Sequence, residues 1–297
     1  MNPVVSIALR LALGVCLIAP LSLSADGMSA DEIMKASDRA YRGSFTTALI
    51  KVQLTTCRYA VKGEAISCRE KPRITVLEAV EKKWGADRKD SHSIAMVLQP
   101  ATDKGVGMLS YEYYQGDKEN DVLLYLPALG KTRRVVSSGG GNEDGGSFFG
   151  TEFFVDDTQL KKIDQYTFKL VRDDVYEGRP VWVIEATPNA RRAPKTQYGK
   201  IQMWVDKERK LIVREDIFNK AGKFYRQRLN TQYTQVDGVW LAKRQTMKNL
   251  LTQRVSVLAN LSAAYNREVS NELVSERSLT DVTFRERELA ALRAKTK

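Results

Sequence analysis

The chain has 297 residues, of which 43% are hydrophobic and 28% are charged, and its formal net charge is +11. This hydrophobic fraction is typical of a globular domain with a sizeable core and excludes an intrinsically disordered chain. One histidine, His92, and three cysteines are too few for a His-rich or Cys-rich metal site, and a serine triad would depend on His92 alone, so we expect no cofactor.

The first 25 residues have the order of a secretory signal peptide. Arg10 precedes a hydrophobic run at 11–21, and mostly small residues follow at 22–25. Because a bilayer core needs about 20 apolar residues, a permanent membrane anchor is the weaker interpretation. We predict a cleaved signal peptide at 1–25 and a single domain with a helical C-terminal tail at 26–297. Outside the cytoplasm the basic charge favours anionic lipid or an acidic partner over nucleic acid, although it could serve solubility alone.

The first element of the exported chain is predicted to be a helix. Ser29 and Glu32 have the spacing of a capping box. Hydrophobic residues then recur at helical intervals from Ile33 to Tyr41, and Gly43 provides a stop signal. One helix therefore opens the domain.

Cys57 and Cys68 remain after the signal peptide, which contains Cys16, is removed. They lie at equal distances from Lys62 and Gly63, so a two-residue turn at this point would place them opposite each other on neighbouring strands. Since an exported protein reaches an oxidising compartment, we predict a Cys57–Cys68 disulfide. A reactive or metal-binding pair is the alternative, but it lacks the short spacing and the further ligands of such sites.

The rest of the chain is predicted to be mainly β. Turn signals separate β-rich runs at 62–63, 116–117, 177–178, 220–222 and 237–238. Short connections of this kind join antiparallel neighbours. No βαβ rhythm, internal repeat or linker interrupts the pattern, which favours one domain. The charged stretch at 280–297 is predicted to be a helix with frayed ends.

Two predicted strands are hydrophobic on both faces. Every residue from Val181 to Ile184 is apolar, and Trp204 opposes Met203 and Val205. Both faces must therefore be covered. A helix or a second sheet could cover one face, and a sheet curved around an apolar interior could cover the other. That interior is either packed or open to a ligand, and periodicity alone favours packing.

A glycine-rich stretch at 137–147 precedes four phenylalanines, Phe148, Phe149, Phe153 and Phe154. It is not a phosphate-binding loop, because it has no lysine and carries two acidic residues that would repel phosphate. The oxygen ligands also lack the spacing of a calcium loop. The stretch either returns to the core or forms a mobile lip over an apolar cavity, and both alternatives stay open.

The remaining candidates for chemistry are few. Asp156, Asp157 and Asp164 could act as catalytic carboxylates, but acidic residues of a basic protein are usually surface ion partners, so we do not expect an enzyme. His92 precedes a hydrophobic run and is predicted to lie at the start of a strand. The basic pairs at 133–134, 191–192 and 243–244 are predicted to be solvated, unless the fold gathers them around one rim that could bind phosphate or carboxylate headgroups.

Three motifs resemble, in their order, the signature of the LolA-like outer-membrane lipoprotein-sorting family. They are Lys104-Gly105, the run LYLPALGKTRR at 124–134 and the run GSFFGTEF at 146–153. The run WVDK at 204–207 and the turn at 222–223 also look like this family. The resemblance covers roughly residues 30–279.

This resemblance implies a mainly β fold of the α+β class, in which a curved antiparallel sheet, or incomplete β-barrel, is capped by helices. It implies a hydrophobic cavity without catalytic residues that accepts acyl chains. The protein would then be a periplasmic carrier that binds a lipid or a lipoprotein acyl chain for outer-membrane sorting or export. It would touch the membrane surface transiently and work beside an exporter of the resistance-nodulation-division type.

On this interpretation each group of candidate residues has a role. Phe148, Phe149, Phe153 and Phe154 form the gate, Trp182 and Trp204 line or floor the cleft, and Arg133 and Arg134 meet the headgroup. The alternative is a non-catalytic regulatory or scaffolding module of the same fold, whose groove binds an exporter or another envelope protein.

Overall fold

The structure is a computed structural model that describes residues 27–62, 65–135 and 146–294. The predicted signal peptide and most of the glycine-rich stretch lie outside these residues. The strands of the described chain form one antiparallel sheet of 14 strands, in the order β7-β6-β5-β4-β3-β1-β14-β13-β12-β11-β10-β9-β8, with β2 paired to β1 beside this path.

The strands are β1 (Thr47–Lys62), β2 (Ala65–Cys68), β3 (Arg73–Trp84), β4 (Asp90–Gln99), β5 (Gly107–Glu112), β6 (Asp121–Leu126), β7 (Lys131–Arg134), β8 (Tyr166–Tyr176), β9 (Arg179–Pro188), β10 (Tyr198–Asp206), β11 (Ile212–Asn219), β12 (Phe224–Val236), β13 (Val239–Asn249) and β14 (Arg254–Tyr265). The α-helices are α1 (Ala30–Arg42), α2 (Val155–Thr158), α3 (Arg277–Thr280) and α4 (Val282–Ala294). The short 3-10 helices are η1 (Ala101–Asp103), η2 (Pro127–Leu129), η3 (Phe148–Gly150), η4 (Ile163–Gln165), η5 (Ala193–Lys195) and η6 (Glu272–Val274).

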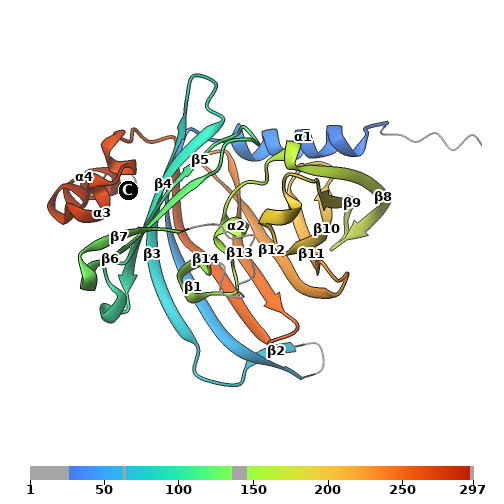
Figure 1. The fold of residues 1–297 in the computed structure, drawn as a ribbon, viewed down its shortest axis with the longest axis horizontal. Helices are drawn as coiled ribbons and strands as arrows, with labels where there is room; N and C mark the ends of the chain where they lie inside the picture. Colours follow the sequence, from blue (N-terminus) through green and yellow to red (C-terminus); the bar gives the residue numbers. More distant parts are fainter. Residues whose placement is uncertain (1–26, 63–64, 136–145, 295–297) are drawn as a thin grey trace, which may run out of the picture.

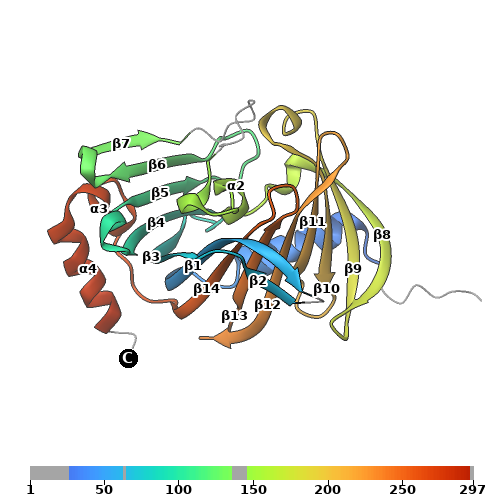
Figure 2. The same ribbon diagram turned by 90° about the horizontal axis from the view of Figure 1, so that it is seen from below.

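The sheet is strongly curved and unclosed. Figures 1 and 2 show it bending around one side, with β7 and β8 at opposite ends, and these two strands do not pair with each other. The predicted fold class is therefore confirmed. We call the concave side, which carries α1 and α2, the inner face, and the opposite side the outer face.

Helix α1 begins where the sequence predicts. Ser29 is its N-cap, and the capping box with Glu32 is present, with the Ser29 backbone N–H donating to the Glu32 carboxylate at 2.7 Å. Ile33 and Met34 are buried and belong to the core cluster of the inner face, together with Trp182. Burial of this hydrophobic side of α1 fixes the helix across the inner face of β8–β12 (Figures 1 and 2).

Strand β9 is buried on both faces, as predicted. Trp182 and Ile184 belong to the inner core, whereas Val181 and Val183 belong to a separate outer cluster that contains Trp204. The outer cover here is neither a helix nor a second sheet within the described chain. Instead, the guanidinium carbon of Arg214 lies 4.3 Å from the centre of the Trp204 ring, so a long cationic side chain shields the apolar surface.

Helices α3 and α4 cover the outer face at the other end of the sheet (Figures 1 and 2). Their residues Leu279, Leu289 and Leu292 pack against Val80 and Leu109 of β3 and β5. The predicted C-terminal helix is therefore present, and it is part of the core. None of the helices in residues 27–294 that the structure describes is both long and apolar enough to span a membrane.

The Cys57–Cys68 disulfide is present, with the two Cα atoms 5.7 Å apart, but the predicted register is wrong. Cys68 is paired with Tyr59 in the β1–β2 ladder, and Lys62 with Ala65, whereas a turn at 62–63 would place Cys68 opposite Cys57. Cys57 lies opposite Val255 of β14. The bond is therefore diagonal, which the Cα separation allows.

Candidate functional site

Residues 146–165, which precede β8, cross the inner face of the sheet, and we call them the crossing segment. It contacts strands that are far apart in the sheet. The Glu152 N–H donates to Ser256 Oγ of β14 at 2.8 Å, Gln159 Nε2 to Ser110 Oγ of β5 at 3.2 Å, and Lys161 Nζ to a Glu215 carboxylate oxygen of β11 at 2.7 Å. The segment therefore encloses space between itself and the curved sheet.

A buried ion pair anchors the crossing segment. Arg226 of β12 is fully buried and donates to the Asp157 carboxylate at 2.8 Å, and the Tyr198 hydroxyl donates to the same carboxylate at 2.6 Å. Burial alone would raise the pKa of Asp157, but the Arg226 charge and the Tyr198 hydrogen bond outweigh it and lower the pKa. Asp157 is therefore a buried structural ion partner, which corrects the prediction of a surface position.

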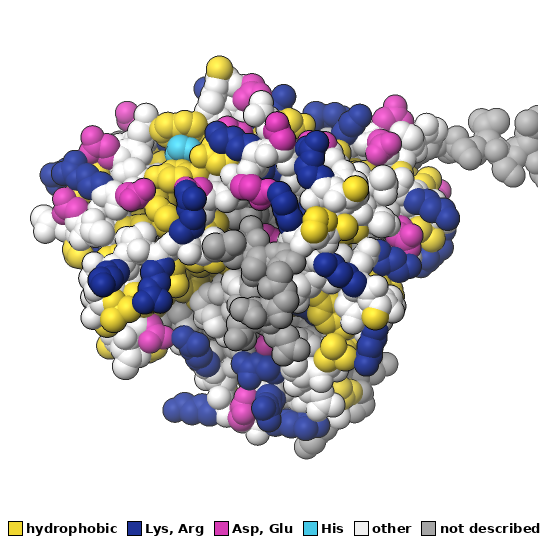
Figure 3. All heavy atoms as spheres, in the orientation of Figure 1, with side chains coloured by type: hydrophobic (Ala, Val, Ile, Leu, Met, Phe, Trp, Pro, Cys, Tyr) yellow, Lys and Arg dark blue, Asp and Glu magenta, His cyan; other side chains and the backbone are white. Residues whose placement is uncertain are grey.

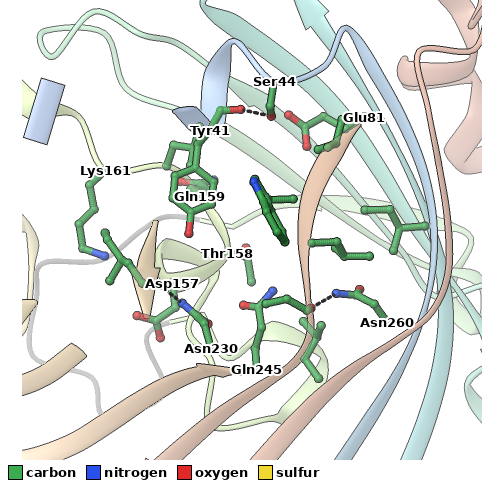
Figure 4. Close-up of a pocket in the computed structure, with 18 of the residues that line it drawn as sticks. Tyr41, Ser44, Glu81, Asp157, Thr158, Gln159, Lys161, Asn230, Gln245 and Asn260 are labelled. Carbon is green, nitrogen blue, oxygen red and sulfur yellow. Dashed lines mark hydrogen bonds between the residues drawn. The ribbon is translucent and has the colours of Figure 1, made fainter. Parts of the chain in front are cut away.

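A cavity of about 370 Å³ lies between the inner face, the C-terminal part of α1 and the crossing segment. Figure 4 shows Tyr41, Gln159 and Lys161 on one side of it, and Glu81 and Asn260 on the other. The interior is therefore packed beside β9 and β10, as periodicity favours, and hollow beside β1, β3 and β14. A volume of this size is within the usual range of small-molecule pockets, about 300–1,000 Å³.

One side of the cavity wall is hydrophobic. It is formed by β3, β1 and β14, which are neighbours in the sheet, together with the start of the crossing segment. Its side chains are Ile50, Val52, Leu77, Ala79, Phe148 and Leu258. They also belong to one core cluster, so this part of the wall is continuous.

The opposite side is polar and is formed by the crossing segment, β11 and β12. Lys161 and Arg228 both approach Glu215, at 2.7 and 3.6 Å. Burial opposes ionisation of Glu215, but the charges of Lys161 and Arg228 lower its pKa, and Glu215 in turn raises the pKa of Lys161. Glu215 and Lys161 therefore stay ionised together.

Further charged groups line the cavity where α1 ends. Asp38 pairs with Arg42 at 2.7 Å, and Glu81 with Lys83 at 2.6 Å. Glu112 also lines the cavity, and its burial, with a further contribution from the Glu81 charge, raises its pKa to about 7. Within the chain that the structure describes, no group of three or more His, Cys, Asp or Glu side chains could hold a metal ion.

The four predicted gate residues occupy different places. Phe148 lines the cavity, and its ring lies 4.8 Å from that of Phe149. Phe149 packs against the buried cluster that contains Met108. Phe153 is buried in the inner core, and the Phe154 ring lies 4.0 Å from the guanidinium carbon of Arg226. The structure therefore brings only Phe148 of these four to the cavity wall.

The two predicted tryptophans lie away from the cavity wall. Trp182 is buried in the inner core, and the amine of Lys210 lies 4.4 Å from its ring. Trp204 lies on the outer face below Arg214. Neither is among the residues that line the cavity.

The predicted headgroup residues Arg133 and Arg134 are exposed on the edge strand β7, where Arg134 pairs with Asp121 at 2.7 Å. On the face in Figure 3, lysine and arginine side chains are scattered among acidic ones and do not form one patch. His92 lies in β4 near its start, as predicted, with its ring 4.0 Å from that of Trp84.

The sequence did not point to the polar wall. Lys161, Glu215 and Arg228 look like ordinary surface charges, and Tyr41 like part of the apolar stripe of α1. Glu215 alone carried a usable signal, because it alternates with Ile217 in a β-rich run and so shares the face of a core residue. Recognising the partners of Glu215 needs the path of the crossing segment.

The comparisons with known proteins agree with this architecture. A family model described as an uncharacterized protein matches residues 89–281, more than half of the chain. None of the curated proteins matches the sequence.

Three solved structures have a similar fold. A DUF1329 family protein from Desulfovibrio piger is 20% identical, with a TM-score of 0.73 over 84% of this chain and 97% of that one. A domain described as an outer membrane lipoprotein-sorting protein, from Vibrio parahaemolyticus, is 18% identical, with a TM-score of 0.71 over 84% and 98%. A LolA superfamily protein from Nitrosomonas europaea is 16% identical, with a TM-score of 0.62 over 84% and 99%.

These identities are low, so the likeness concerns the fold, and it confirms the resemblance that the motifs at 104–105, 124–134 and 146–153 indicate. The family match rests on the sequence itself. The chain therefore belongs to the family of uncharacterized proteins that this model describes, and its curved antiparallel sheet is the fold of the LolA superfamily.

Proposed function

We propose that the protein is a carrier that binds a lipid, or the acyl chain of a lipoprotein, in the cavity of its inner face. The observation that carries the proposal is the continuous hydrophobic wall of β3, β1 and β14, which faces an empty volume of about 370 Å³. Two of the similar structures are described as a lipoprotein-sorting domain and a LolA superfamily protein, which supports this use of the fold.

Burial of an alkyl chain would supply the affinity. Each methylene group removed from water contributes about 0.8 kcal/mol, so a 14-carbon chain contributes on the order of 10 kcal/mol before the entropy costs of binding. Such binding needs no specific polar contacts with the ligand. The cavity would therefore hold a chain until an acceptor competes for it.

The proposal includes the location and the route of the protein. The signal-like order of residues 1–25 and the Cys57–Cys68 disulfide support export to the periplasm. There the carrier would meet the membrane surface transiently and would exchange its cargo with an envelope partner, such as an exporter of the resistance-nodulation-division type.

Phe148 is the residue of the predicted gate to which we assign a role. It lines the cavity and also a neighbouring pocket of about 140 Å³, so its ring is part of the wall that both share. Movement of this ring would join the two volumes. Phe149, Phe153 and Phe154 would then support Phe148 from the surrounding core and would not touch the ligand.

Filling the cavity tests the carrier function. Ala79 lines the hydrophobic wall, so Ala79→Trp would place an indole in the space for the chain, whereas Ala221→Trp would add the same ring to the exposed turn between β11 and β12. We expect Ala79→Trp to weaken the binding of a fluorescent fatty acid about tenfold or more, and Ala221→Trp to leave it unchanged. Thermal denaturation of both variants shows whether the fold is intact.

Two further measurements use the protein purified from the periplasm. Mass spectrometry of extracted lipids should find a bound amphiphile, and labelled lipid should move between vesicles faster in the presence of the protein. If the wild type carries no lipid, transfers none and instead co-purifies with a stoichiometric protein partner, the scaffolding alternative is correct and the carrier function is wrong.

A further inference from the structure

The polar wall of the cavity carries two cations for one carboxylate. Lys161 Nζ donates to Glu215 at 2.7 Å, and an Arg228 nitrogen lies 3.6 Å from the other carboxylate oxygen. The side chains of Lys161 and Arg228 keep 20% and 17% of their surface exposed, whereas Glu215 keeps 3%. All three residues line the cavity, and the two cations are more exposed than the carboxylate between them.

The cluster has an excess of one positive charge and spare hydrogen-bond donors. An ammonium group has three N–H donors, and the Lys161 ammonium uses one of them on Glu215. The Tyr41 hydroxyl of α1 lies on the same side of the cavity as Lys161 (Figure 4), and burial raises its pKa. The crossing segment and β12 therefore bring positive charge to one end of the cavity, on the same side as Tyr41 of α1.

The acidic groups near this end do not cancel its charge. Asp38, Glu81 and Asp157 each have a cationic partner of their own, at 2.7, 2.6 and 2.8 Å. Glu112 lies on the cavity wall, and Glu81, Lys83 and Arg42 are the charged groups with the largest effects on its pKa. An anion bound at the cluster would therefore meet an excess of positive charge.

The hydrophobic wall begins on the other side of β13 in the sheet order. β12 and β11 carry the cationic cluster, while β14, β1 and β3 carry Leu258, Val52 and Leu77. A molecule lying across these strands would have one end against polar side chains and the other end against hydrophobic ones. That is the pattern of an amphiphile held with its head inside the protein.

We propose that the cavity binds a single-chain anionic amphiphile with its head inside, so that a carboxylate or phosphate group meets Lys161, Arg228 and Tyr41 while the chain lies along β14, β1 and β3. This inference rests on the proposed carrier function and adds the class of the cargo and its orientation. It moves the headgroup site from Arg133 and Arg134 on the exposed edge to the interior. Charge-assisted hydrogen bonds in a desolvated site give this end its selectivity.

A purely structural role for Lys161 has a different consequence. If Lys161 only ties the crossing segment to β11, its replacement would change the stability of the protein and lower the affinity for every ligand to the same degree. If Lys161 receives the head of the ligand, its replacement would weaken the anionic ligand and spare a neutral one of the same chain length.

The test uses matched probes on the full exported protein, each below its micellar concentration. Hexadecanoate is compared with its methyl ester, and lysophosphatidic acid with the monoacylglycerol of the same chain, by calorimetry. The wild type should bind each anion about tenfold tighter than its neutral counterpart. The tighter of the two anions shows whether the head is a carboxylate or a phosphate.

Lys161→Gln should remove most of this preference for the anion and leave the affinity for the neutral probe within about twofold. Arg228→Gln removes the other cation of the cluster and should show the same loss, so the test does not depend on the stability of one variant. Lys200→Gln is the matched control, because Lys200 forms a 2.9 Å pair with Glu185 outside the cavity. It should leave both affinities unchanged.

Each outcome decides one of the two proposals. If the wild type binds acid and ester equally, or if both variants keep the full preference for the anion, the inference is wrong and the carrier function stands. If the wild type binds none of the four probes, the carrier function and the inference fail together.

Discussion

Glu112 is a carboxyl group on the cavity wall that forms no ion pair with any residue of the described chain. The amide nitrogen of Leu160 lies 3.4 Å from its carboxylate. Burial, followed by the charge of Glu81, raises the pKa of Glu112 from 4.5 to about 7, although Lys83 and Arg42 partly oppose this rise. The native protein therefore takes up this proton more readily than the unfolded chain does.

The sign of the resulting pH dependence follows from linkage. Below pH 4.5 both states are protonated at this position, and the stabilising contribution of Glu112 is fully present. As the pH rises from 4.5 through about 7, the unfolded chain loses the proton first, so the contribution decreases and is lost above that range. Over this window Glu112 lowers the free energy of unfolding.

We predict that Glu112→Gln removes this part of the pH dependence. The stability of the variant relative to the wild type should increase from pH 4.5 to pH 7 by on the order of 1–3 kcal/mol, as the size of the pKa shift requires. Urea denaturation across this range measures the difference. Glu177→Gln, in the exposed turn between β8 and β9, is the control for the loss of a surface carboxylate, and a constant difference for Glu112→Gln would contradict the prediction.

Single residues of the site were predictable to different degrees. Phe148 follows a glycine-rich stretch, for which the sequence left open both a return to the core and a lip over a cavity. Lys161 and Arg228 are long charged residues, which are usually exposed, and their shared partner Glu215 is separated from Lys161 by 54 positions in the chain. Local patterns cannot report such a contact, because only the path of the crossing segment creates it.

At the scale of elements, turns were more predictable than register. The turns at 177–178, 220–222 and 237–238 lie between strands as expected, and Gly178, Gly222 and Gly238 have φ of 76°, 76° and 79°, a conformation that glycine adopts at low cost. The β1–β2 hairpin has several adjacent candidate turn pairs. A shift of its turn by one residue changes which residues face each other, so the disulfide was predictable but its register was not.

The crossing segment depends on one buried ion pair, and we predict a large effect when one partner is removed. Arg226→Met leaves the Asp157 carboxylate in the interior without its cation, which should lower the free energy of unfolding by about 3–5 kcal/mol. Hydrogen exchange should show the loss of protection in the crossing segment before the loss in β12 and β13.

The double variant Asp157→Asn with Arg226→Met is the matched comparison, since it removes both charges. It should recover part of the lost stability, because no uncompensated charge remains. If the single and double variants lose the same free energy, the ion pair does not hold the segment in place. Arg254→Met, which removes a partly exposed pair with Glu152, should cost less than about 1 kcal/mol.

At the scale of the whole molecule, one sheet is covered by different layers on its two faces. The inner face carries α1, the crossing segment and the cavity, and the outer face carries α3 and α4 over β1 and β3–β5. The sequence predicted that both faces need a cover and that the chain ends in a helix. It could not show where that helix packs, because Leu279, Leu289 and Leu292 fit any apolar surface of suitable size.

The two layers are packed differently, so we predict that a substitution in the outer layer leaves ligand binding in the inner layer unchanged. Buried side chains of α3 and α4 pack directly on the sheet in the outer layer, whereas the inner layer keeps a cavity. Leu279 of α3 is fully buried in the outer layer, so Leu279→Asp places a carboxylate among Val80, Leu109 and Leu289. We expect the free energy of unfolding to fall by about 3 kcal/mol or more, from lost burial and from an unpaired polar group.

The fraction of Leu279→Asp protein that remains folded should still bind the fluorescent fatty acid with unchanged affinity, because the substitution and the cavity lie on opposite faces of the sheet. Val282→Asp is the control at a nearby exposed position, 55% accessible, and should change neither property. Denaturation curves and binding isotherms at low temperature measure both effects. A loss of affinity in Leu279→Asp without unfolding would mean that the outer helices control the width of the cavity, and the two layers would then be coupled through the sheet.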